Sequence, residues 1–345
     1  MKKIIIIIFI LLIAIKGLLQ AQTTKSQYKI VNTFHIDGDD WWDYLTMDEA
    51  TERLFISHGT QVQVLDVNKG KVIGTIPDTK GVHGIALAPD LNKGFTSNGS
   101  DSSVTVFNLT TLAVSKKIKV TGTGPDAILY DPFTHRVFTF NGRSSNVTVI
   151  DANKNKVIGT IPLDGKPEFA VTDGQGKLFV NIEDKIEVSL INPSTMKVEQ
   201  TWSLGLCESP SGMAMDKVNH LLFIVCDNKL MTIMNSQTGK VIRRLPIGEH
   251  PDGCAFDPVL MRAYSSNGDG TLTVVQEEAA NKFSVLENIT TQKGARTITL
   301  DLKTHHLYLS AAEYLPAPAP TTDNPNPRPA IKPDTFVVIE IEPVN

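Results

Sequence analysis

Seven polar side chains recur along the chain at intervals of about 42 residues, and they are the strongest candidates for chemistry. Four are carboxylic acids, and the others are a histidine, a serine and an arginine. Carboxylates that lie close together raise one another's pKa or recruit a cation, and their oxygen atoms suit Ca²⁺ or Mg²⁺. In chain order the seven residues are Asp43, His83, Asp126, Glu168, Ser211, Asp252 and Arg296.

A metal site is one interpretation of this set. His58 belongs to the repeat before that of His83, and both are expected near the same end of the fold. With Asp43 or Asp126, the two histidines would form a His/carboxylate site for a transition metal. The candidate ligands for a divalent cation in the set are His83, Asp126, Glu168 and Asp252. The alternative interpretation, a solvated polar surface with no ligand, stays open.

The remaining candidates suit an organic ligand. Arg296 would clamp a carboxylate or phosphate, or neutralise the neighbouring acids. Trp41 and Trp42 directly precede Asp43. We expect one indole to pack beneath the polar residues and the other to be available for stacking on a ligand.

An internal repeat determines how these residues are positioned. The sequence Lys71–Pro77 recurs unchanged at Lys156–Pro162, and Lys240–Pro246 is a looser copy. A period near 42 residues then aligns the whole chain into repeats at 41–81, 82–124, 125–166, 167–209, 210–250, 251–294 and 295–345. Each repeat holds short apolar stretches of strand length, separated by Gly, Asn, Asp and Pro. Four strands per repeat of this length are typical of a β-propeller blade.

The sequence therefore predicts an all-β, WD40-like fold of seven four-stranded blades. The last repeat supplies only three strands, at 296–300, 306–310 and 336–342. The spare strand is Tyr28–Ile36, ahead of the first repeat. We predict that it completes blade seven, which would hide two strand edges.

The second strands carry Phe95-Thr96-Ser97-Asn98, Phe138-Thr139-Phe140-Asn141 and Tyr264-Ser265-Ser266-Asn267. With Val147–Asp151 and Lys156–Pro162, these segments resemble the YVTN-repeat β-propellers, above all the exported YncE-like proteins. The resemblance covers 28–345. The final Asn is replaced by His58, Ile182, Cys226 and Ala311 in blades one, four, five and seven. The resemblance implies the fold, a proline-rich loop in the last blade and single-stranded DNA as one ligand class.

In a propeller the first strand of each blade lines the central channel. The seven polar residues stand near the start of these strands, so we expect them to form a ring at one channel mouth. The loop 315–333 has seven prolines in 19 residues and is predicted on the same face. It cannot continue a strand or a helix, and we expect it to cover the mouth or to present a partner site.

The amino terminus and the cysteines indicate in which cellular compartment the protein is expected. Residues 1–21 combine a basic start, an apolar run and a small residue, which predicts a cleavable signal peptide and a periplasmic or secreted protein. An uncleaved anchor is the alternative. No membrane span is expected after cleavage. Cys207 and Cys226 are the candidate disulfide pair near the mouth end of blade five, whereas Cys254 falls at a core position.

Charge helps to rank three functions for the single domain 22–345. Net charge is −4 for the whole chain and −7 without residues 1–21, which disfavours phosphate-backbone binding. The favoured function is a module that binds a small molecule or a protein at the channel mouth, without catalysis of its own. The alternatives are a metal-assisted, lactonase-like hydrolase and a single-stranded DNA-binding protein.

Overall fold

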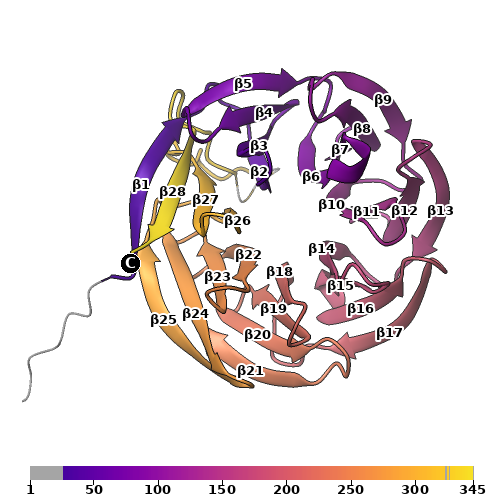
Figure 1. Ribbon diagram of the computed structural model, residues 1–345. Coiled ribbons are helices and arrows are strands. Elements are labelled where there is room, and N and C mark those ends of the chain that lie inside the picture. Colours follow the sequence, from indigo (N-terminus) through magenta and orange to yellow (C-terminus); the bar gives the residue numbers. More distant parts are fainter. Residues whose placement is uncertain (1–25, 323–324, 326, 345) are drawn as a thin grey trace, which may run out of the picture.

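The computed structural model describes residues 26–322, 325 and 327–344 as seven four-stranded antiparallel sheets around a central channel (Figure 1). The predicted seven-bladed, all-β propeller is confirmed. The predicted signal peptide lies outside the described residues. Within the described residues, helix is limited to two single 3₁₀ turns, Pro89–Leu91 and Glu183–Lys185. No helix within the described residues is long and apolar enough to cross a bilayer.

Each of blades one to six runs from the channel outwards in chain order. Blade one is β2 (Trp42–Asp48), β3 (Arg53–His58), β4 (Gln61–Asp66) and β5 (Lys71–Ile76). Blade two is β6 (Val82–Ala88), β7 (Lys93–Asn98), β8 (Ser103–Asn108) and β9 (Val114–Lys119). Blade three is β10 (Pro125–Asp131), β11 (Arg136–Asn141), β12 (Asn146–Asp151) and β13 (Lys156–Pro162).

Blades four to six repeat this order. Blade four is β14 (Pro167–Thr172), β15 (Leu178–Ile182), β16 (Glu187–Asn192) and β17 (Lys197–Ser203). Blade five is β18 (Pro210–Asp216), β19 (Leu221–Cys226), β20 (Leu230–Asn235) and β21 (Val241–Pro246). Blade six is β22 (Pro251–Asp257), β23 (Arg262–Asn267), β24 (Thr271–Ala279) and β25 (Lys282–Thr290).

Blade seven is closed by the amino-terminal strand, as predicted. It consists of β26 (Thr297–Asp301), β27 (His306–Ala311), β28 (Val337–Pro343) and, outermost, β1 (Tyr28–His35). β1 pairs with β28 from Tyr28 opposite Pro343 to His35 opposite Val337. The two ends of the described chain thus lie side by side at the rim (Figure 1).

The core lies between adjacent blades. The second and third strands of each blade are almost wholly buried, whereas the outer strands are largely exposed. Aromatic side chains join neighbours: the rings of Phe55 in blade one and Phe107 in blade two lie 5.8 Å apart. Burial on both faces explains why these strands read as continuous apolar runs of Val, Ile, Leu and Phe.

The asparagine that ends the second strand clasps its own blade. Asn98 Nδ2 donates to Ser103 Oγ and Thr105 Oγ1 at 3.0 and 2.9 Å. Asn267 makes the equivalent bonds to Thr271 and Thr273, at 3.0 and 3.1 Å. Both asparagines are buried, so the bonds satisfy polar groups that water cannot reach. The recurring asparagine is therefore a structural residue of the blade.

Candidate functional site

The innermost strands of blades one to six carry a register shift directly after their first residue. A β-bulge of this kind leaves residues unpaired and re-aims their side chains. Six of the predicted polar residues fall in these bulges, and Arg296 directly precedes β26. We call the seven together the polar ring: Asp43, His83, Asp126, Glu168, Ser211, Asp252 and Arg296.

Side chains of the second strands hold the bulges in place. Ser97 Oγ accepts from Gly84 N at 2.9 Å and donates to the carbonyl of Asp126 in the next blade. Ser266 donates to the carbonyl of Arg296 in the same manner. The sequence motif that builds the blades therefore also fixes the backbone of the polar ring.

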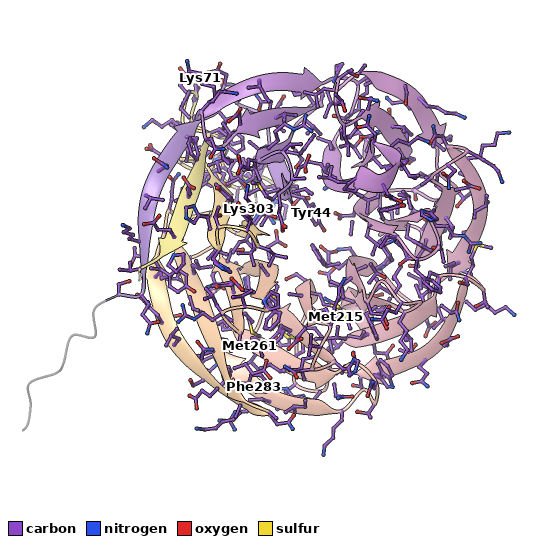
Figure 2. The ribbon with its side chains drawn as sticks, in the orientation of Figure 1. Tyr44, Lys71, Met215, Met261, Phe283 and Lys303 are labelled. Atoms are coloured by element: carbon purple, nitrogen blue, oxygen red, sulfur yellow. A yellow bond between two sulfur atoms is a disulfide. The ribbon has the colours of Figure 1, made fainter. Side chains whose placement is uncertain are left out.

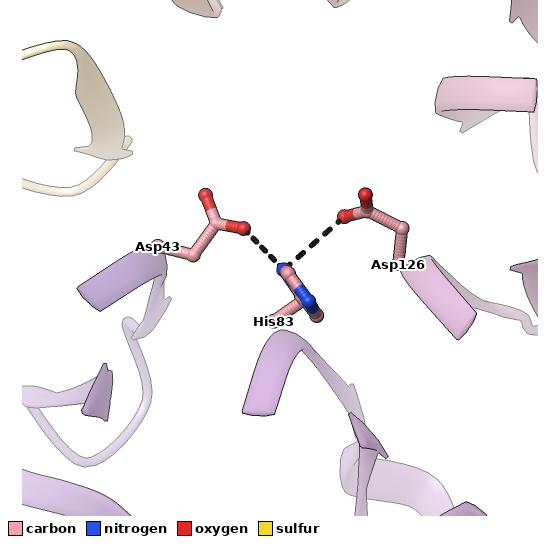
Figure 3. Close-up of side chains that lie close together, drawn as sticks. All are labelled: Asp43, His83 and Asp126. Carbon is pink, nitrogen blue, oxygen red and sulfur yellow. Dashed lines mark hydrogen bonds and ion pairs between the residues drawn. The ribbon is translucent and has the colours of Figure 1, made fainter. Parts of the chain in front are cut away.

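Three members of the polar ring form a compact group. His83 Nδ1 lies 2.7 Å from Asp43 Oδ2 and 3.6 Å from Asp126 Oδ1 (Figure 3). One ligand atom from each residue lies within 4.8 Å of the others. The side chains are 18, 38 and 24% exposed for Asp43, His83 and Asp126, so a solute can reach them. The arrangement suits either a protonated imidazole between two carboxylates or a metal ion.

The other ring residues are engaged in pairs. Glu168 Oε2 lies 3.3 Å from Lys166 Nζ, which also pairs with Glu183. Arg296 is ion-paired with Asp252. In this structure it therefore neutralises a neighbouring acid, which is one of the two roles expected from the sequence. Ser211 Oγ donates to the carbonyl of Pro251 at 2.9 Å.

Residues of the polar ring line two separate cavities. One of about 220 Å³ occupies the channel and is lined by Asp43, Glu168 and Asp252 together with Tyr44 and Phe169. The rings of these two aromatic residues stack 5.5 Å apart, and Tyr44 lies at the central opening (Figure 2). The second cavity, of about 680 Å³, lies outside the mouth and is lined in part by polar-ring members. The mouth therefore has room for a small organic ligand.

Burial and repulsion from neighbouring carboxylates raise the pKa values of Asp126, Glu168 and Asp252. Burial, with the charge of Asp126, raises the pKa of Glu168 to about 8. Burial raises the pKa of Asp126 to about 6, with a contribution from Asp43, and that of Asp252 to about 6 although Arg296 opposes the rise. Burial alone would lower the pKa of His83, but the hydrogen bond to Asp43 and the charge of Asp126 raise it to about 9. At neutral pH, His83 is therefore a cation.

These pKa values predict that stability falls as the pH rises from 6 to 9. Protonated His83 stabilises the fold fully below about pH 6.5, and this is lost as the pH rises through 9. Ionising Glu168 opposes folding, because its carboxyl ionises more readily in the unfolded chain. We expect a thermal midpoint roughly 5 °C lower at pH 9 than at pH 6, with a smaller difference in Glu168→Gln. A midpoint that stays constant or rises would contradict this prediction.

One predicted candidate, His58, lies away from the group formed by Asp43, His83 and Asp126. His58 is fully buried: Nδ1 bonds Gln63 Oε1 at 2.7 Å and Nε2 bonds the carbonyl of Asp40 at 2.9 Å. It is not part of the group formed by Asp43, His83 and Asp126. His58 ends a second strand at the position where other blades place the clasping asparagine, so it faces the interior of its blade.

Trp42 is the indole that packs beneath the polar ring. It is 5% exposed and contacts Phe336, with ring centroids 5.0 Å apart. Trp41 is 46% exposed, and both indoles border a cavity of about 170 Å³ together with His83 and Arg296. Trp41 is therefore the more accessible of the two indoles at the mouth.

Sequence analysis did not single out three cationic residues at the mouth: Arg143, Lys166 and Arg328. All three line the 680 Å³ cavity. Arg143 follows the motif ending in Asn141-Gly142, and Lys166 directly precedes the proline that starts β14. Arg328 belongs to the proline-rich loop. Their positions do not recur from blade to blade, so the repeat gave no signal for them.

The proline-rich loop is fastened to the mouth face at its base. Leu315 N donates to the carbonyl of Ala330 at 2.8 Å, and Lys332 N to that of Glu313 at 2.9 Å. Near its end, Asp334 N donates to Asp39 Oδ1 at 2.9 Å. Arg328 lines cavities together with His83, so the loop lies beside the polar ring.

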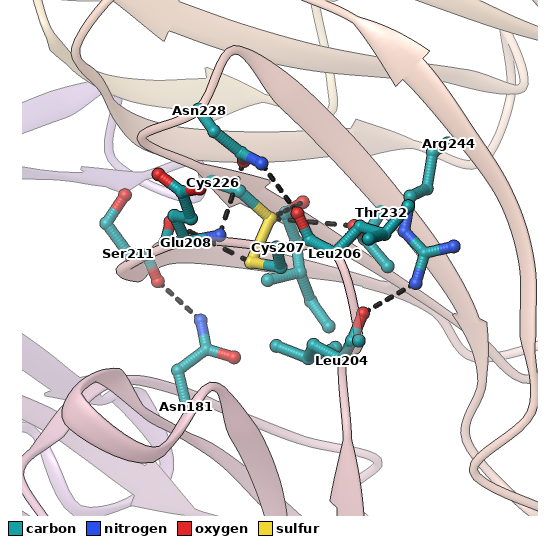
Figure 4. Close-up of a disulfide and its surroundings, with 12 residues drawn as sticks. Asn181, Leu204, Leu206, Cys207, Glu208, Ser211, Cys226, Asn228, Thr232 and Arg244 are labelled. Carbon is teal, nitrogen blue, oxygen red and sulfur yellow. Dashed lines mark hydrogen bonds between the residues drawn. A yellow bond between two sulfur atoms is a disulfide. The ribbon is translucent and has the colours of Figure 1, made fainter.

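The predicted disulfide between Cys207 and Cys226 is present (Figure 4). It ties the segment that enters blade five to the end of β19, and both sulfur-bearing side chains are buried. Cys254 is a free, buried thiol, as its core position predicted. Cys207 lies four residues before Ser211 in the chain, so the disulfide restrains the segment that leads to this member of the polar ring.

Comparisons with known proteins extend to the fold alone. No protein-family profile matches the chain, and no curated protein matches it. Among solved structures, the chain is similar to Kuenenia stuttgartiensis hydrazine synthase, with 18% sequence identity and a TM-score of 0.68. The likeness covers 85% of this chain and 96% of that chain. Because one fold hosts many functions, these comparisons establish a seven-bladed β-propeller and no activity.

Proposed function

We propose that this chain is an exported propeller of the YVTN-repeat kind that binds a small polar ligand at its channel mouth. The first ligand proposed there is a divalent cation. The observation that carries the proposal is the group of Asp43, His83 and Asp126, which offers one nitrogen and two carboxylate oxygens from three successive blades. Imidazole with carboxylates suits Zn²⁺ better than the Ca²⁺ or Mg²⁺ expected from carboxylates alone. The disulfide is consistent with an oxidising compartment, periplasmic or extracellular.

Elemental analysis of residues 22–345 after dialysis without chelator tests the cation. We expect about one divalent metal ion per chain, and its loss in Asp126→Asn and His83→Asn, because each removes a ligand. Asp164→Asn is the matched control, since Asp164 is an exposed acid on the same face outside the polar ring. A metal-free protein that also fails to bind added Zn²⁺, Mn²⁺ or Ca²⁺ in a calorimeter would remove the cation from the proposal.

A metal-assisted hydrolase of the lactonase type is the second candidate. One observation favours it: Glu168, beside the group, has a pKa near 8 and could exchange a proton with a reacting oxygen. A screen of lactones and esters with the metal-loaded protein tests this function. Hydrolysis that is lost in Glu168→Gln while the metal is retained would support it, and no hydrolysis of any member would reject it.

Single-stranded DNA binding has less support. It requires a basic groove with aromatic platforms, whereas the polar ring contributes four acids to the mouth. The described lining of the 680 Å³ cavity contains no Phe, Tyr or Trp. Binding that weakens steeply with salt would be the sign of this function.

A further inference from the structure

We infer that the 680 Å³ cavity outside the channel mouth, which we call the vestibule, binds a small organic dianion that carries carboxylate or phosphate groups. The inference rests on the proposed function, because it names the class of ligand that the mouth takes. Its residues differ from the proposed cation group: the vestibule is lined by His83, Gly99, Ser100, Gly124, Asp126, Gly142, Arg143, Lys166 and Arg328.

Two exposed guanidinium groups at the vestibule, those of Arg143 and Arg328, have no protein partner within the described residues. In the part of the chain that the structure describes, neither Arg143 nor Arg328 has a hydrogen-bond or ion-pair partner. Among the other arginines, Arg53, Arg136, Arg244, Arg262 and Arg296 each bond a carbonyl, hydroxyl or carboxylate. Arg243, exposed on outer strand β21, has no such partner among the described residues and lines no part of the vestibule. A guanidinium binds carboxylate or phosphate oxygens in a two-pronged, charge-assisted manner. Two unpaired guanidinium groups on one cavity therefore match a ligand with two negative charges.

The other charged side chains that line the vestibule already have partners. His83 Nδ1 lies 2.7 Å from Asp43 Oδ2 and 3.6 Å from Asp126 Oδ1. Lys166 is paired with Glu168 and Glu183. Among the described lining residues of the vestibule, Arg143 and Arg328 are thus the cationic side chains left to contact a ligand.

Glycine at the vestibule wall allows the side chain of Arg143 to lie close to the backbone. Gly124 has φ +62°, and a Cβ there would stand 2.7 Å from Arg143 Cγ. The stem of Arg143 is thus seated against bare backbone. Glycine also leaves the facing backbone accessible to a ligand.

Arg328 is held by a short, stiff piece of chain. Pro327 and Pro329 flank it, and proline fixes φ near −65°, which limits the backbone freedom on both sides. The hydrogen bond between Leu315 and Ala330 closes the loop behind it. A backbone that is restricted before the ligand arrives lowers the entropy cost of binding.

Calorimetric titration of residues 22–345 with inorganic phosphate and with succinate tests the inference. We expect one site per chain for at least one of these dianions. Arg143→Gln and Arg328→Gln should each weaken binding by about tenfold or more, because each removes a charge-assisted contact. Arg243→Gln is the matched control, since Arg243 is an exposed arginine on outer strand β21, and it should leave binding unchanged.

Three outcomes would overturn the inference: no binding of either dianion, equal binding in all variants, or saturable binding of an oligo-dT strand with none of the small anions. Zn²⁺ titrations of the same variants separate it from the proposed function. Arg143→Gln should bind metal as the parent does. Metal binding without anion binding would reject the vestibule alone, and anion binding without metal would reject only the cation.

Discussion

A chain that starts at Asp37, and so lacks β1, is expected to unfold roughly 10 °C below the full mature domain or to aggregate during refolding. Tyr28 and Ile36 are both buried, and losing a large buried side chain costs about 3 kcal/mol or more. For a domain of this size, each kcal/mol lowers the midpoint by about 2 °C or more. The deletion also exposes the edge of β28, which can then pair with another molecule.

Tyr28 links blade seven to blade six, which makes its substitution a useful companion. Its hydroxyl bonds Tyr264 Oη at 2.9 Å and accepts from Arg262 Nη1 at 2.8 Å. Tyr28→Phe keeps the ring and removes these bonds, so it should lower stability by only about 1–3 kcal/mol. Thermal and urea unfolding of both variants measure the effect. A truncated chain with an unchanged midpoint would mean that β1 does not close the propeller in solution.

Removal of the disulfide is the second large effect. Cys207 and Cys226 are 19 residues apart, and a cross-link that closes a loop of this length stabilises a fold by about 3 kcal/mol. We expect Cys207→Ser/Cys226→Ser to lower the free energy of unfolding by about this amount, mainly because the unfolded chain is no longer constrained. Urea unfolding with and without reductant measures it.

The third cysteine provides the control for the disulfide. Cys254 is buried in β22, with Sγ 3.5 Å from the carbonyl of Phe223. Cys254→Ala should keep the full sensitivity of the parent to reductant, whereas the double variant should have none. If reductant leaves the parent's unfolding curve unchanged, the cross-link contributes nothing to stability.

The fold could be predicted because the same short signals recur in register. The repeated Lys-Val-Ile-Gly-Thr-Ile-Pro segment set the period, and the strand left over at 28–36 matched the strand missing from blade seven. Equivalence between repeats also aligned the positions that the structure gathers at the channel mouth. The alignment did not predict the β-bulges that orient these side chains. The residues within the bulges differ in type from blade to blade, so no recurring residue marks the register shift.

The errors at the site have a common physical cause. The mouth-end positions of His58 and His83 in their strands predict a shared group. Strand alternation and the position of the blade-clasping asparagine instead direct His58 inward, onto Gln63. Arg143, Lys166 and Arg328 come from a hairpin turn, an inter-blade loop and the proline-rich loop. Such residues meet only when the ring closes in three dimensions, and no repeat-based comparison pairs them.

The closure of blade seven also determines how the molecule responds to force. β1 and β28 run antiparallel, with Tyr28 opposite Pro343, and Val344 N donates to the carbonyl of Gln27 at 2.6 Å. A pull between the two ends therefore loads this ladder from one end, so its hydrogen bonds break one after another, like a zipper. Mechanical resistance is then set by one backbone pair at a time, however high the equilibrium stability of the propeller.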